Sequence, residues 1–537
     1  MESWTGRARR EGEAMADTSG AVLKNPATGE TIGFAREGTA ADVKAAVEEA
    51  RAAQPLWASL PIRRRVRCIH AMRDYIAAHA DELCSVISRS TGKTRIDAMS
   101  TEVLSSAMAA AYYAKIAPRI HRASRIEGGN ILLFSKTSYV TRVPFGVIGI
   151  ISPWNYPFSI PFHEVVMALL AGNAVVLKVA TQTQGVGDCI AEMAAASGLP
   201  GGIFKLVHVP GAVAGTAMLE AGVNKLFFTG STSVGRELMA KAAAHLTPVV
   251  LELGGNDAMI VLDDASPERA AAGAIWAGIS NAGQSCGGVE RVFVCYGIYE
   301  AFKERLARIV ENLRIGADTS FEVDIGSLTQ AEQKRKVDQF VADALAKGAS
   351  VVCRRDVPAD AGALFSPVLV LENTDDSMLV MKEEVFGPVL AVRKVRDEEE
   401  AVRLANASQY GLSASVWSKS GRRARRIAER LEAGTVTIND HLMSHGMAET
   451  PWGGFKSSGI GRSHGEIGFL EMSQPRVVVK ELLHRMPRNM WWYPHNKGLY
   501  DGLRSALHFL YGKGPLSRLG AMVRLVILFM RSFRKGY

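Results

Sequence analysis

The sequence predicts an α/β protein in which helices cover both faces of a mostly parallel sheet. Two observations carry this prediction. Residues 39–117 repeat apolar positions with a helical period, and from about residue 143 short β-branched runs alternate with helical segments. The 537 residues, 47% hydrophobic and 22% charged, fit two or three globular domains. This balance excludes a collagen, a long disordered chain and a disulfide-stapled miniprotein.

The helical part comes first along the chain. Its Ala-, Arg- and Glu-rich stretches place apolar side chains three or four positions apart, as at Val66, Ile69, Met72 and Ile76. This spacing gathers the apolar side chains on one face of a helix. We expect these amphipathic helices to form a covering layer over the sheet.

Seven short β-branched runs follow and predict the strands of the sheet. They are VIGIIS (147–152), AVVLKVA (174–180), KLFFTG (225–230), VVLELGG (249–255), AMIVLDD (258–264), RVFVCYG (291–297) and PVLAVRKV (388–395). The segment 440–465 is rich in glycine and has almost no periodicity, so it predicts irregular backbone. A loop of that length in a compact domain tends to be functional.

Charge and cysteine usage describe the two ends of the chain and its compartment. The net charge of +9 lies entirely in residues 485–537, which hold ten Lys or Arg residues and one acidic residue, Asp501. Residues 1–20 mix acidic and basic side chains without the apolar stretch of a signal peptide, and they predict a disordered extension. The six cysteines show no C-x-x-C pair and no zinc-ligand spacing. We therefore expect a reduced, cytoplasmic protein without a metal site.

Cys286, in NAGQSCGGVER, is the most informative cysteine. Small residues on both sides let the backbone turn closely around the thiol, and Arg291 is near enough to support the loop or the local positive potential. A nucleophilic cysteine needs such an activating environment. The alternative is a buried, inert cysteine beside a tight turn.

Two polar residues follow predicted strands. Glu252 ends the apolar run VVLE before two glycines, where a carboxylate needs a partner or a task, and a general base is one such task. Its alternative is a capping or ion-paired glutamate. Asn155 follows VIGIIS in SPWNYPF, where its amide can donate to a developing oxyanion or simply form a turn.

The segment FFTGSTSVG resembles a phosphate-binding turn only in part. It places Gly230 and Gly235 after a strand and before a helix expected to begin near Arg236. The G-x-x-x-x-G spacing fails the Rossmann fingerprint and lacks the Lys-Ser/Thr of a P-loop. It still suits a phosphate at a helix N-terminus.

Taken together, the motifs point to one family. PWNYP, FTGSTSVG, LELGG, GQSC with the following Arg291, EEVFGP and PWGGFKSSGIGR occur in the order, and at about the intervals, seen in the NAD(P)-dependent aldehyde dehydrogenase superfamily. The chain resembles this superfamily over about residues 21–484. The resemblance implies a fold with a Rossmann-type cofactor domain, an α/β catalytic domain and a small β oligomerisation element.

The resemblance also implies domain boundaries and an assembly. The NAD(P)-binding domain would comprise residues 21–122 and 145–254, and the catalytic domain residues 255–450. Residues 123–144 and 470–484 would form oligomerisation strands of a homodimer or homotetramer. Residues 485–537 remain as a basic, amphipathic tail.

The motif positions imply a role for each site residue. Cys286 matches the nucleophile, Glu252 the general base, and Asn155 together with the Cys286 backbone N–H the oxyanion hole. Positions matching the cofactor contacts are Trp154, Lys178, Gly230, Ser231, Glu384 and Phe386. The implied reaction oxidises an aldehyde to its carboxylic acid through a Cys286 thiohemiacetal and a thioester, which Glu252-activated water hydrolyses. Relatives that pass the acyl group to coenzyme A generally lack this glutamate, so Glu252 favours hydrolysis.

Three positions depart from the family pattern. Where many members have K-P-S-E, this chain has Lys178-Val-Ala-Thr181, so the acid that would bond the adenosine 2′-hydroxyl of NAD is replaced by a neutral threonine. A carboxylate would repel a 2′-phosphate, whereas threonine can donate to it, so we expect use of NADP, alone or together with NAD. Asn256 and Ser463 replace a common lysine and a common glutamate, and we expect neither to touch the chemistry.

The substrate is suggested by side chains near the motifs. Trp154 and Tyr156, with Phe158 and Met443 as looser candidates, favour an apolar tunnel. No arginine in these segments is placed to recognise a second carboxylate. An apolar aldehyde is therefore expected, and one of medium or long chain if the C-terminal tail described below meets a membrane.

The tail predicts two helices, 499–511 and 516–533. Leu503, Ala506, Leu507 and Leu510 share a face of the first helix. In the second helix, LVILFM is far shorter than the ~20 apolar residues of a membrane span.

The second predicted helix of the tail also carries charge. Arg524, Arg531 and Lys535 fall on one side of it, and Trp491, Trp492 and Tyr493 precede both helices. This pattern favours peripheral attachment to an anionic membrane surface. The alternative is packing of the tail on its own subunit or on a partner subunit.

Three rival functions remain. One is acyl transfer or ester hydrolysis at Cys286 without redox chemistry. Another is a catalytically silent membrane or partner scaffold, which would need none of the site residues. Nucleic-acid binding is disfavoured because aliphatic residues, rather than exposed stacking platforms, separate the basic residues of the tail.

Overall fold

A computed structural model describes residues 20–486, 489 and 491–532. The predicted disordered extension therefore lies outside the described residues, apart from Gly20. The chain divides into two compact units. The first comprises residues 1–121 and 143–474, and the second residues 122–142 and 475–537.

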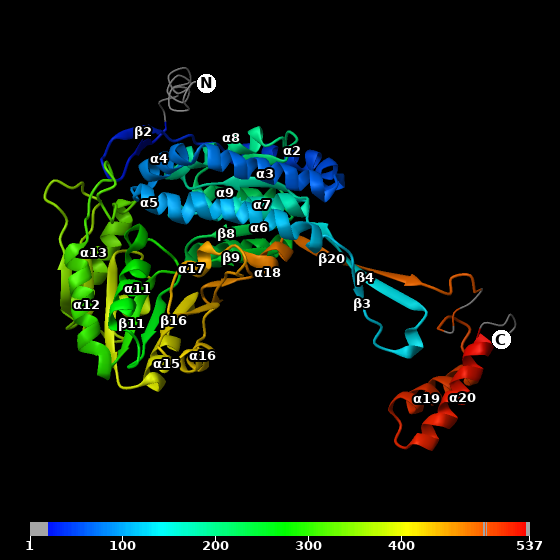
Figure 1. Cartoon of the computed structure of the whole chain (residues 1–537). Helices are drawn as coiled ribbons and strands as arrows, with labels where there is room; N and C mark the ends of the chain where they lie inside the picture. The colour runs from blue at the N-terminus through cyan, green and yellow to red at the C-terminus, as the bar shows by residue number, and fades with distance from the viewer. Residues whose placement is uncertain (1–19, 487–488, 490, 533–537) are drawn as a thin grey trace. The chain divides into compact units, whose positions relative to one another are not determined.

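The predicted helical layer is present in the first unit (Figure 1). Its helices are α2 (Ala40–Ser59), α3 (Ile62–Ala78), α4 (Ala80–Thr91), α5 (Arg95–Asp97) and α6 (Leu104–Ile120), with a π-helical turn at Ala98–Val103. Ile69, Met72 and Ile76 are fully buried, as their spacing predicted. Gly92 ends α4 in the left-handed conformation, with φ 81°.

The first sheet has the Rossmann strand order. Its strands are β5 (Val147–Ile151), β6 (Ala174–Lys178), β7 (Phe204–Leu206), β8 (Lys225–Thr229), β9 (Val249–Glu252) and the antiparallel edge strand β19 (Gly459–Ile460). They are arranged β19-β9-β8-β5-β6-β7, so the parallel strands follow the order 3-2-1-4-5 in chain numbering. Such sheets bind ligands at the carboxyl ends of the strands, where the order reverses.

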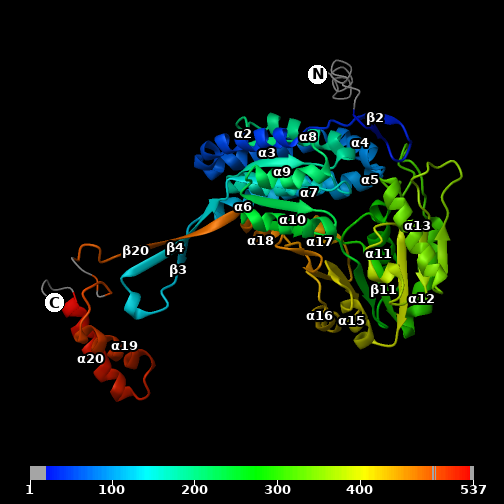
Figure 2. The same cartoon turned by 180° about the vertical axis from the view of Figure 1, so that it is seen from behind.

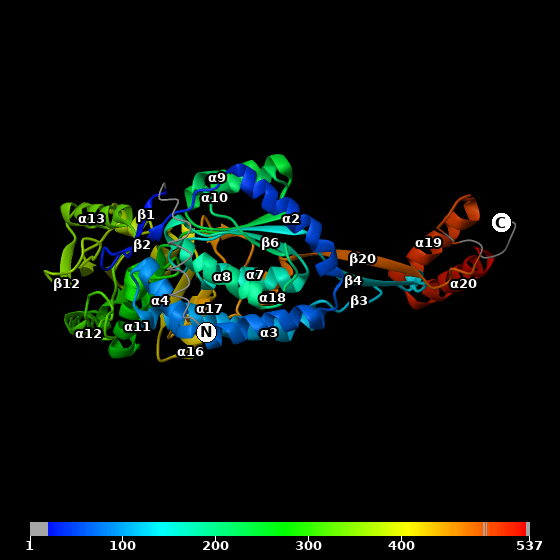
Figure 3. The same ribbon diagram turned by 90° about the horizontal axis from the view of Figure 1, so that it is seen from above.

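Helices cover both faces of this sheet. They are α7 (Ser159–Ala171), α8 (Gln184–Ala196), α9 (Gly211–Glu220), α10 (Thr232–His245) and α18 (Gly465–Leu470). Figure 3 shows α2, α9 and α10 on one side of β6, and α3, α7 and α8 on the other. Because both faces are buried, the strands are continuously apolar rather than alternating.

The second sheet of the first unit has seven strands in the order β12-β13-β14-β11-β10-β16-β17. Their bounds are β10 (Asp257–Val261), β11 (Val289–Cys295), β12 (Ser350–Arg355), β13 (Val368–Glu372), β14 (Val389–Val395), β16 (Ser413–Trp417) and β17 (Thr435–Ile438). All neighbours are parallel except β12, which runs antiparallel to β13. The covering helices are α11 (Pro267–Ile279), α12 (Tyr299–Asn312), α13 (Ala331–Ala346), α14 (Leu379–Lys382), α15 (Glu398–Asn406) and α16 (Gly421–Ala428).

The seven β-branched runs all form strands, and the α/β prediction is confirmed. Short elements complete the unit: β1 (Val22–Lys24), β2 (Thr31–Phe34), β15 (Tyr410–Gly411), β18 (Phe455–Lys456) and α17 (Met443–Gly446). Within 440–465 the backbone is irregular except for α17, β18 and β19. Each large sheet has its own hydrophobic core.

The second unit contains a three-stranded sheet and a helical hairpin (Figure 2). The sheet has the order β20-β4-β3, with β3 at Ser124–Ile126, β4 at Lys136–Pro144 and β20 at Ser473–Glu481. The hairpin is α19 (Lys497–Tyr511) packed on α20 (Pro515–Ser532), and Asn496 caps α19 by accepting from the Leu499 N–H at 2.9 Å. No helix in the described part of the chain is both long and apolar enough to cross a membrane.

The buried face of α19 agrees with the predicted one only in part, since Ala506 is buried and Leu503 and Leu510 are partly buried. Leu499, Gly502 and Ala506 are buried, while Leu507 is 59% exposed. The buried face therefore lies on the side of Gly502 and Ala506 and away from Leu507.

Candidate active site

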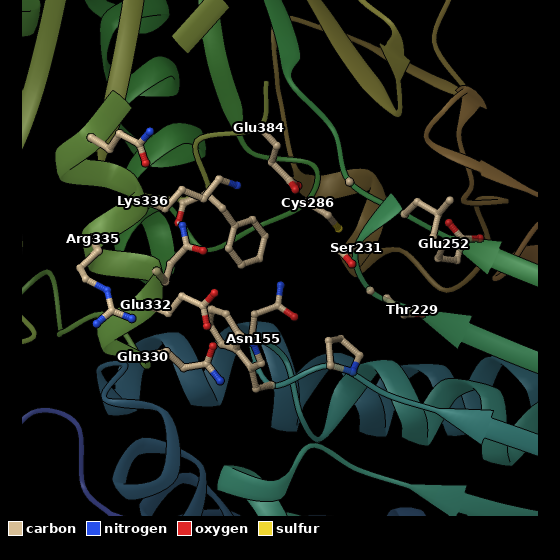
Figure 4. Close-up of a pocket in the computed structure, with 18 residues that line it drawn as sticks. Asn155, Thr229, Ser231, Glu252, Cys286, Gln330, Glu332, Arg335, Lys336 and Glu384 are labelled. Carbon is tan, nitrogen blue, oxygen red and sulfur yellow. The ribbon is translucent and has the colours of Figure 1, made fainter. Parts of the chain in front are cut away.

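A cavity of about 540 Å³ brings most of the predicted site together (Figure 4). Its wall includes eight of the ten predicted residues: Trp154, Asn155, Gly230, Ser231, Glu252, Cys286, Glu384 and Phe386. Lys178 and Thr181 lie outside this wall. One side of the cavity comes from α13, whose Gln333 and Lys336 were not predicted, because a helical Gln-x-x-Lys spacing is common on exposed faces.

Cys286 lies in a tightly folded loop between α11 and β11. Asn281 and Ala282 adopt the left-handed conformation, with φ 53° and 55°. Gly283 follows at φ 75°, and a Cβ there would lie 2.2 Å from the Gly387 carbonyl group. The Gln284 side chain fastens the loop by accepting from the Thr329 N–H at 2.9 Å and donating to the Asn281 carbonyl at 3.0 Å. Two non-glycine residues with positive φ are costly, so the loop conformation is imposed by its surroundings.

The environment of the thiol keeps it neutral. Burial raises the pKa of Cys286, and the nearby carboxyl groups of Glu384, Asp257 and Glu252 raise it further. Arg291 is not among the groups that shift the pKa of this thiol, and its guanidinium donates to the Asn256 carbonyl at 2.8 Å and to the Leu404 carbonyl at 3.2 Å. Of the two roles considered for Arg291, loop support therefore fits. The thiol must lose its proton to a base before it can act as a nucleophile.

Glu252, at the end of β9, has the properties of such a base. Its Oε1 accepts from the Ser463 N–H at 3.2 Å, whereas its Oε2 has no protein partner. Burial raises its pKa to about 8, against the opposing effects of Ser463 and Arg462. A carboxyl group with this pKa exchanges its proton near neutral pH, as a general base must.

The expectation that neither Asn256 nor Ser463 touches the chemistry is wrong for Ser463, whereas Asn256 acts only through a second residue. The Ser463 N–H holds Glu252 directly. Asn256 donates to the buried Glu290 at 2.8 Å, and Glu290 accepts from the Phe386 N–H at 2.8 Å. Asn256 therefore supports the cofactor-side loop through Glu290.

A buried ion pair positions Asn155. The Lys93 ammonium donates to the Asn155 carbonyl at 2.7 Å and pairs with Glu102 at 2.5 Å, both side chains being fully buried. Glu102 also accepts from the Phe158 N–H at 2.8 Å. The Asn155 amide donates to the Gln284 carbonyl at 3.0 Å, which leaves its second N–H for another acceptor. This pair was not predicted, because Lys93 and Glu102 belong to no motif.

The turn after β8 begins α10 earlier than predicted. The helix starts at Thr232 rather than near Arg236, and Ser231 is its N-cap. Gly235 lies inside the helix, where a Cβ would come within 2.5 Å of Leu253, so this glycine allows close packing. The N-terminal N–H groups of this 14-residue helix therefore start at the cavity wall, where they can bind a phosphate.

Glu384 and Phe386 form the opposite part of the wall. Glu384 accepts from the Gly255 N–H at 3.1 Å, and burial, assisted by Glu290, raises its pKa to about 8. Phe386 has φ 56°, and its ring meets Trp154 edge-on with centroids 5.6 Å apart. Gln333 donates to the Phe386 carbonyl at 2.9 Å, which helps to hold this strained residue.

Lys178 is the last residue of β6 and Thr181 follows the strand, and both lie outside the wall of the polar cavity. Lys178 is 6% exposed, and burial lowers its pKa. Its Nζ would lie 3.6 Å from a Cβ at Gly211, the first residue of α9. Thr181 begins a 3-10 turn and is partly exposed. A cation and a neutral hydroxyl are thus available here, and no carboxylate follows the strand at position 181.

A second, apolar pocket of about 270 Å³ also reaches Cys286. Its remaining lining residues are Ser100, Thr101, Leu104, Ser105, Met108, Tyr156, Trp276, Ser285, Gly287, Leu442, Met443, His445, Gly446 and Trp452. Tyr156 and Met443 line it as predicted. Trp154 lines the polar cavity instead, and Phe158 is fully buried against Phe162, with ring centroids 5.6 Å apart.

The apolar pocket is uncharged. Its lining contains no lysine or arginine, and burial lowers the pKa of His445 to about 4, so this histidine is neutral at pH 7. Among the described residues, no group of three or more His, Cys, Asp or Glu is arranged to hold a metal ion. Cys286 thus stands at the junction of a polar cavity and an apolar one.

Comparison with known proteins gives consistent results. The model of the "Aldehyde dehydrogenase family" matches residues 15–478. A 4,4'-diapolycopene aldehyde oxidase of Methylomonas is 36% identical over 511 residues, which cover 95% of this chain and 94% of that protein.

Solved structures agree with this result. A succinate-semialdehyde dehydrogenase of Burkholderia pseudomallei has a TM-score of 0.83 at 34% identity, covering 87% of this chain and 95% of its own. An NADP-dependent enzyme of E. coli has a TM-score of 0.82 at 33% identity, covering 87% and 96%.

Proposed function

The chain belongs to the aldehyde dehydrogenase family and is an NAD(P)-dependent aldehyde-oxidising enzyme, and we propose that it converts a long apolar aldehyde to its carboxylic acid at Cys286. The observation that carries this proposal is the position of Cys286 between two unlike cavities. The polar cavity has a helix N-terminus for a phosphate, and the apolar pocket has no cation for a second carboxylate.

The first half of the reaction forms a bond to sulfur. Glu252 accepts the thiol proton, and the Cys286 sulfur attacks the aldehyde carbonyl carbon to give a thiohemiacetal oxyanion. The free N–H of the Asn155 amide and the Cys286 backbone N–H stabilise this oxyanion, and loss of one such donor typically costs about 2.7–4 kcal/mol. NAD(P)⁺, when bound, supplies the acceptor for the hydride that leaves the substrate carbon. The carbon held by Cys286 is then oxidised to a thioester.

The second half breaks the bond to sulfur. Glu252, after returning its first proton to solvent, accepts a proton from water. The water oxygen attacks the thioester carbon, the carbon–sulfur bond breaks, and the carboxylic acid leaves. The unpartnered Oε2 of Glu252 supports this role, because a base must have a free lone pair for the water proton.

The polar cavity and the spot at Lys178 fit a dinucleotide. The N–H groups at Ser231 and Thr232 suit the pyrophosphate, while Lys178 suits the adenosine ribose. Since Thr181 is neutral, it tolerates a 2′-phosphate that a glutamate would repel. We therefore propose that NADP is used, alone or with NAD. A kcat/KM for NAD far above that for NADP would contradict this.

The apolar pocket and the comparisons together favour an apolar substrate. The match to the diapolycopene aldehyde oxidase covers 511 residues and leaves 26 residues of this chain unaligned. The tail after His484 has 53 residues, so the match must include part of the tail. The succinate-semialdehyde dehydrogenase covers 87% of the chain, and the apolar pocket offers no cation for a succinate-like carboxylate. The test is chain length: kcat/KM should rise from propanal to decanal, and a flat profile would contradict an apolar site.

We further propose that the helical hairpin α19–α20 attaches the enzyme to an anionic membrane surface. Tyr500, Leu507, Tyr511 and Val523 are 67%, 59%, 70% and 52% exposed. Exposed basic residues accompany them: Lys497, Arg504, Lys513, Arg518 and Arg524. Lys535 and the side chain of Arg531, which the sequence grouped with Arg524, lie outside the described residues. Exposed apolar and basic side chains on one hairpin are typical of interfacial elements.

A truncation tests the attachment. Protein ending at Leu483 should lose co-sedimentation with phosphatidylserine-containing liposomes, while full-length protein should lose it on neutral liposomes or at high salt. Equal co-sedimentation of the truncated and full-length proteins would contradict membrane contact. A change in the mass of the assembly on truncation would favour packing against a partner subunit instead.

The sheet of the second unit supports assembly into a homodimer or homotetramer. Its outer strand β20 exposes Val477 and Val479, at 56% and 58%. An apolar edge strand left open would be prone to aggregation, so we propose that another copy of the chain covers it. Sedimentation of Val479→Lys protein should show smaller assemblies than wild type. An unchanged mass would argue against this edge.

A further inference from the structure

A third cavity, of about 420 Å³, adjoins the apolar pocket beside Cys286. The two cavities share Ser100 and Trp276 in their walls. We call the apolar pocket beside Cys286 the first pocket and the third cavity the distal cavity, because Cys286 lines the apolar pocket but not the third cavity. The shared residues make the two spaces neighbours at Trp276.

The wall of the distal cavity is mostly aliphatic. Helix α11 contributes Ala272, Ile275, Trp276 and Ile279, whose spacing of three and four positions sets them on one face of the helix. The other apolar residues are Ile96, Ile309, Leu313, Val323 and Ile325. Ala272 and Trp276 are exposed, whereas Ile275 and Ile279 are 5% and 2% exposed and belong to the core of the second sheet, so this helix face borders both the core and the cavity.

The polar groups of the distal cavity do not fit a charged ligand. No lysine or arginine lines it. Of its two acidic residues, Asp324 is paired with Arg314 at 2.7 Å, and Asp97 accepts from the Asn281 N–H at 3.4 Å. Two carboxyl groups would repel an anionic ligand, and their existing partners leave little for a cation. The aliphatic wall is therefore its main binding feature.

The rims of both spaces expose large apolar side chains. Ile96, Leu104, Met108 and Trp276 are 57%, 53%, 54% and 43% exposed. Contiguous exposed apolar residues mark binding sites more often than single ones do. Leu104 and Met108 line the pocket at Cys286, Ile96 lines the distal cavity and Trp276 lines both, which outlines a path of apolar side chains from one space to the other.

The size of the first pocket makes this path relevant to the substrate. At about 270 Å³ it is smaller than the ~300–1,000 Å³ of usual ligand pockets, whereas the distal cavity is larger than the first pocket. A long aldehyde with its carbonyl at Cys286 has more chain than the first pocket holds. The neighbouring aliphatic space past Trp276 can accept the remainder.

We propose that the distal cavity binds the far end of a long-chain aldehyde whose carbonyl group lies at Cys286, with Trp276 between the two halves of the site. This inference rests on the proposed function and deepens it, since it assigns a binding site to the part of the alkyl chain that the first pocket cannot hold. Each methylene group buried there can raise kcat/KM by up to about fourfold. The gain should continue for chains that the first pocket cannot hold.

The test compares two aldehydes on one set of variants. The measured quantity is kcat/KM for hexadecanal divided by kcat/KM for decanal, with each aldehyde kept below the concentration at which it aggregates. Ile96→Glu puts a charge into the aliphatic wall at an exposed position and should lower this ratio at least tenfold. Leu56→Glu is the matched control, because Leu56 is an equally exposed apolar residue (63%) on α2, away from the cavities, and should leave the ratio unchanged.

The outcomes separate the two proposals. A wild-type ratio near one, or an unchanged ratio in Ile96→Glu, would overturn the distal cavity while the proposed function stands. Failure to oxidise any aldehyde would overturn the proposed function itself. A crystal structure of Cys286→Ala protein with hexadecanal provides a readout independent of activity. Density for the alkyl chain is expected in the distal cavity beyond Trp276. An alkyl chain that leads directly to solvent, or a second copy of the protein that fills the distal cavity, would contradict the inference.

Discussion

The pKa of Glu252 leads to the sharpest prediction, which concerns pH. Burial raises this pKa to about 8, so about one-tenth of the carboxyl groups are ionised at pH 7 and about nine-tenths at pH 9. Only the ionised form can accept the proton of the attacking water. Where hydrolysis of the thioester limits turnover, kcat should therefore rise about tenfold between these pH values.

The assay separates the two halves of the reaction. Rapid mixing should show a burst of NAD(P)H from the first half, followed by a steady rate set by hydrolysis. In Glu252→Gln protein at high pH, where solvent can take the thiol proton, we expect about one equivalent of NAD(P)H per site in the burst. Its steady rate should fall at least about 100-fold and lose the pH dependence, because no base is left. A kcat that is flat from pH 6 to 9, or that follows a pKa near 4.5, would refute the reasoning.

The same pKa predicts an effect on stability. A carboxyl group whose pKa is higher in the folded state binds its proton more tightly there, so its contribution is present below the unfolded pKa and is lost as pH rises through about 8. Glu252→Gln removes this loss. The variant should be more stable than wild type at pH 9, by at most about 5 kcal/mol, and not at pH 4. Thermal unfolding at both pH values measures the difference, and equal shifts would contradict the assigned pKa.

Three further predictions concern other residues. Asn155→Ala should lower kcat about 10²–10³-fold through loss of an oxyanion donor, and steady-state kinetics showing a change in KM alone would argue against that role. Lys93→Met leaves Glu102 buried without its partner and should lower the free energy of unfolding in denaturant by about 3–5 kcal/mol. The double variant Lys93→Met/Glu102→Gln should restore part of this stability. An unchanged free energy of unfolding in Lys93→Met would contradict the positioning role of the pair. Thr181→Glu should shift the ratio of kcat/KM for NADP over NAD at least tenfold toward NAD, and an unchanged ratio would separate Thr181 from cofactor choice.

Much of the fold and site could be predicted from the sequence, because the signals are local. Each β-branched run became a strand, and the motifs around Asn155, Glu252 and Cys286 meet in one cavity. The contacts that hold these motifs together could not be predicted from the sequence. The pairing of Lys93 with Glu102 and with the Asn155 carbonyl depends on packing between distant segments, which no periodicity encodes.

Other differences have similar causes. Ser463 acts on Glu252 through its backbone N–H, so its side-chain identity gave no hint of the contact. Trp154 and Tyr156 are two positions apart, yet they face different cavities because the chain turns between β5 and α7. The contact face of α19 follows its small residues as much as its large ones, which a count of apolar positions does not reveal.

The proposed reaction requires a thioester at Cys286 that is hydrolysed with Glu252 as the base. Peptide mass spectrometry of Glu252→Gln protein, quenched after mixing with decanal and NADP⁺ at high pH, tests this claim directly. We expect a decanoyl group on the peptide containing Cys286, formed in step with NADPH and absent from Cys286→Ala protein. NADPH formed without that adduct, or an acyl group on another residue, would contradict it.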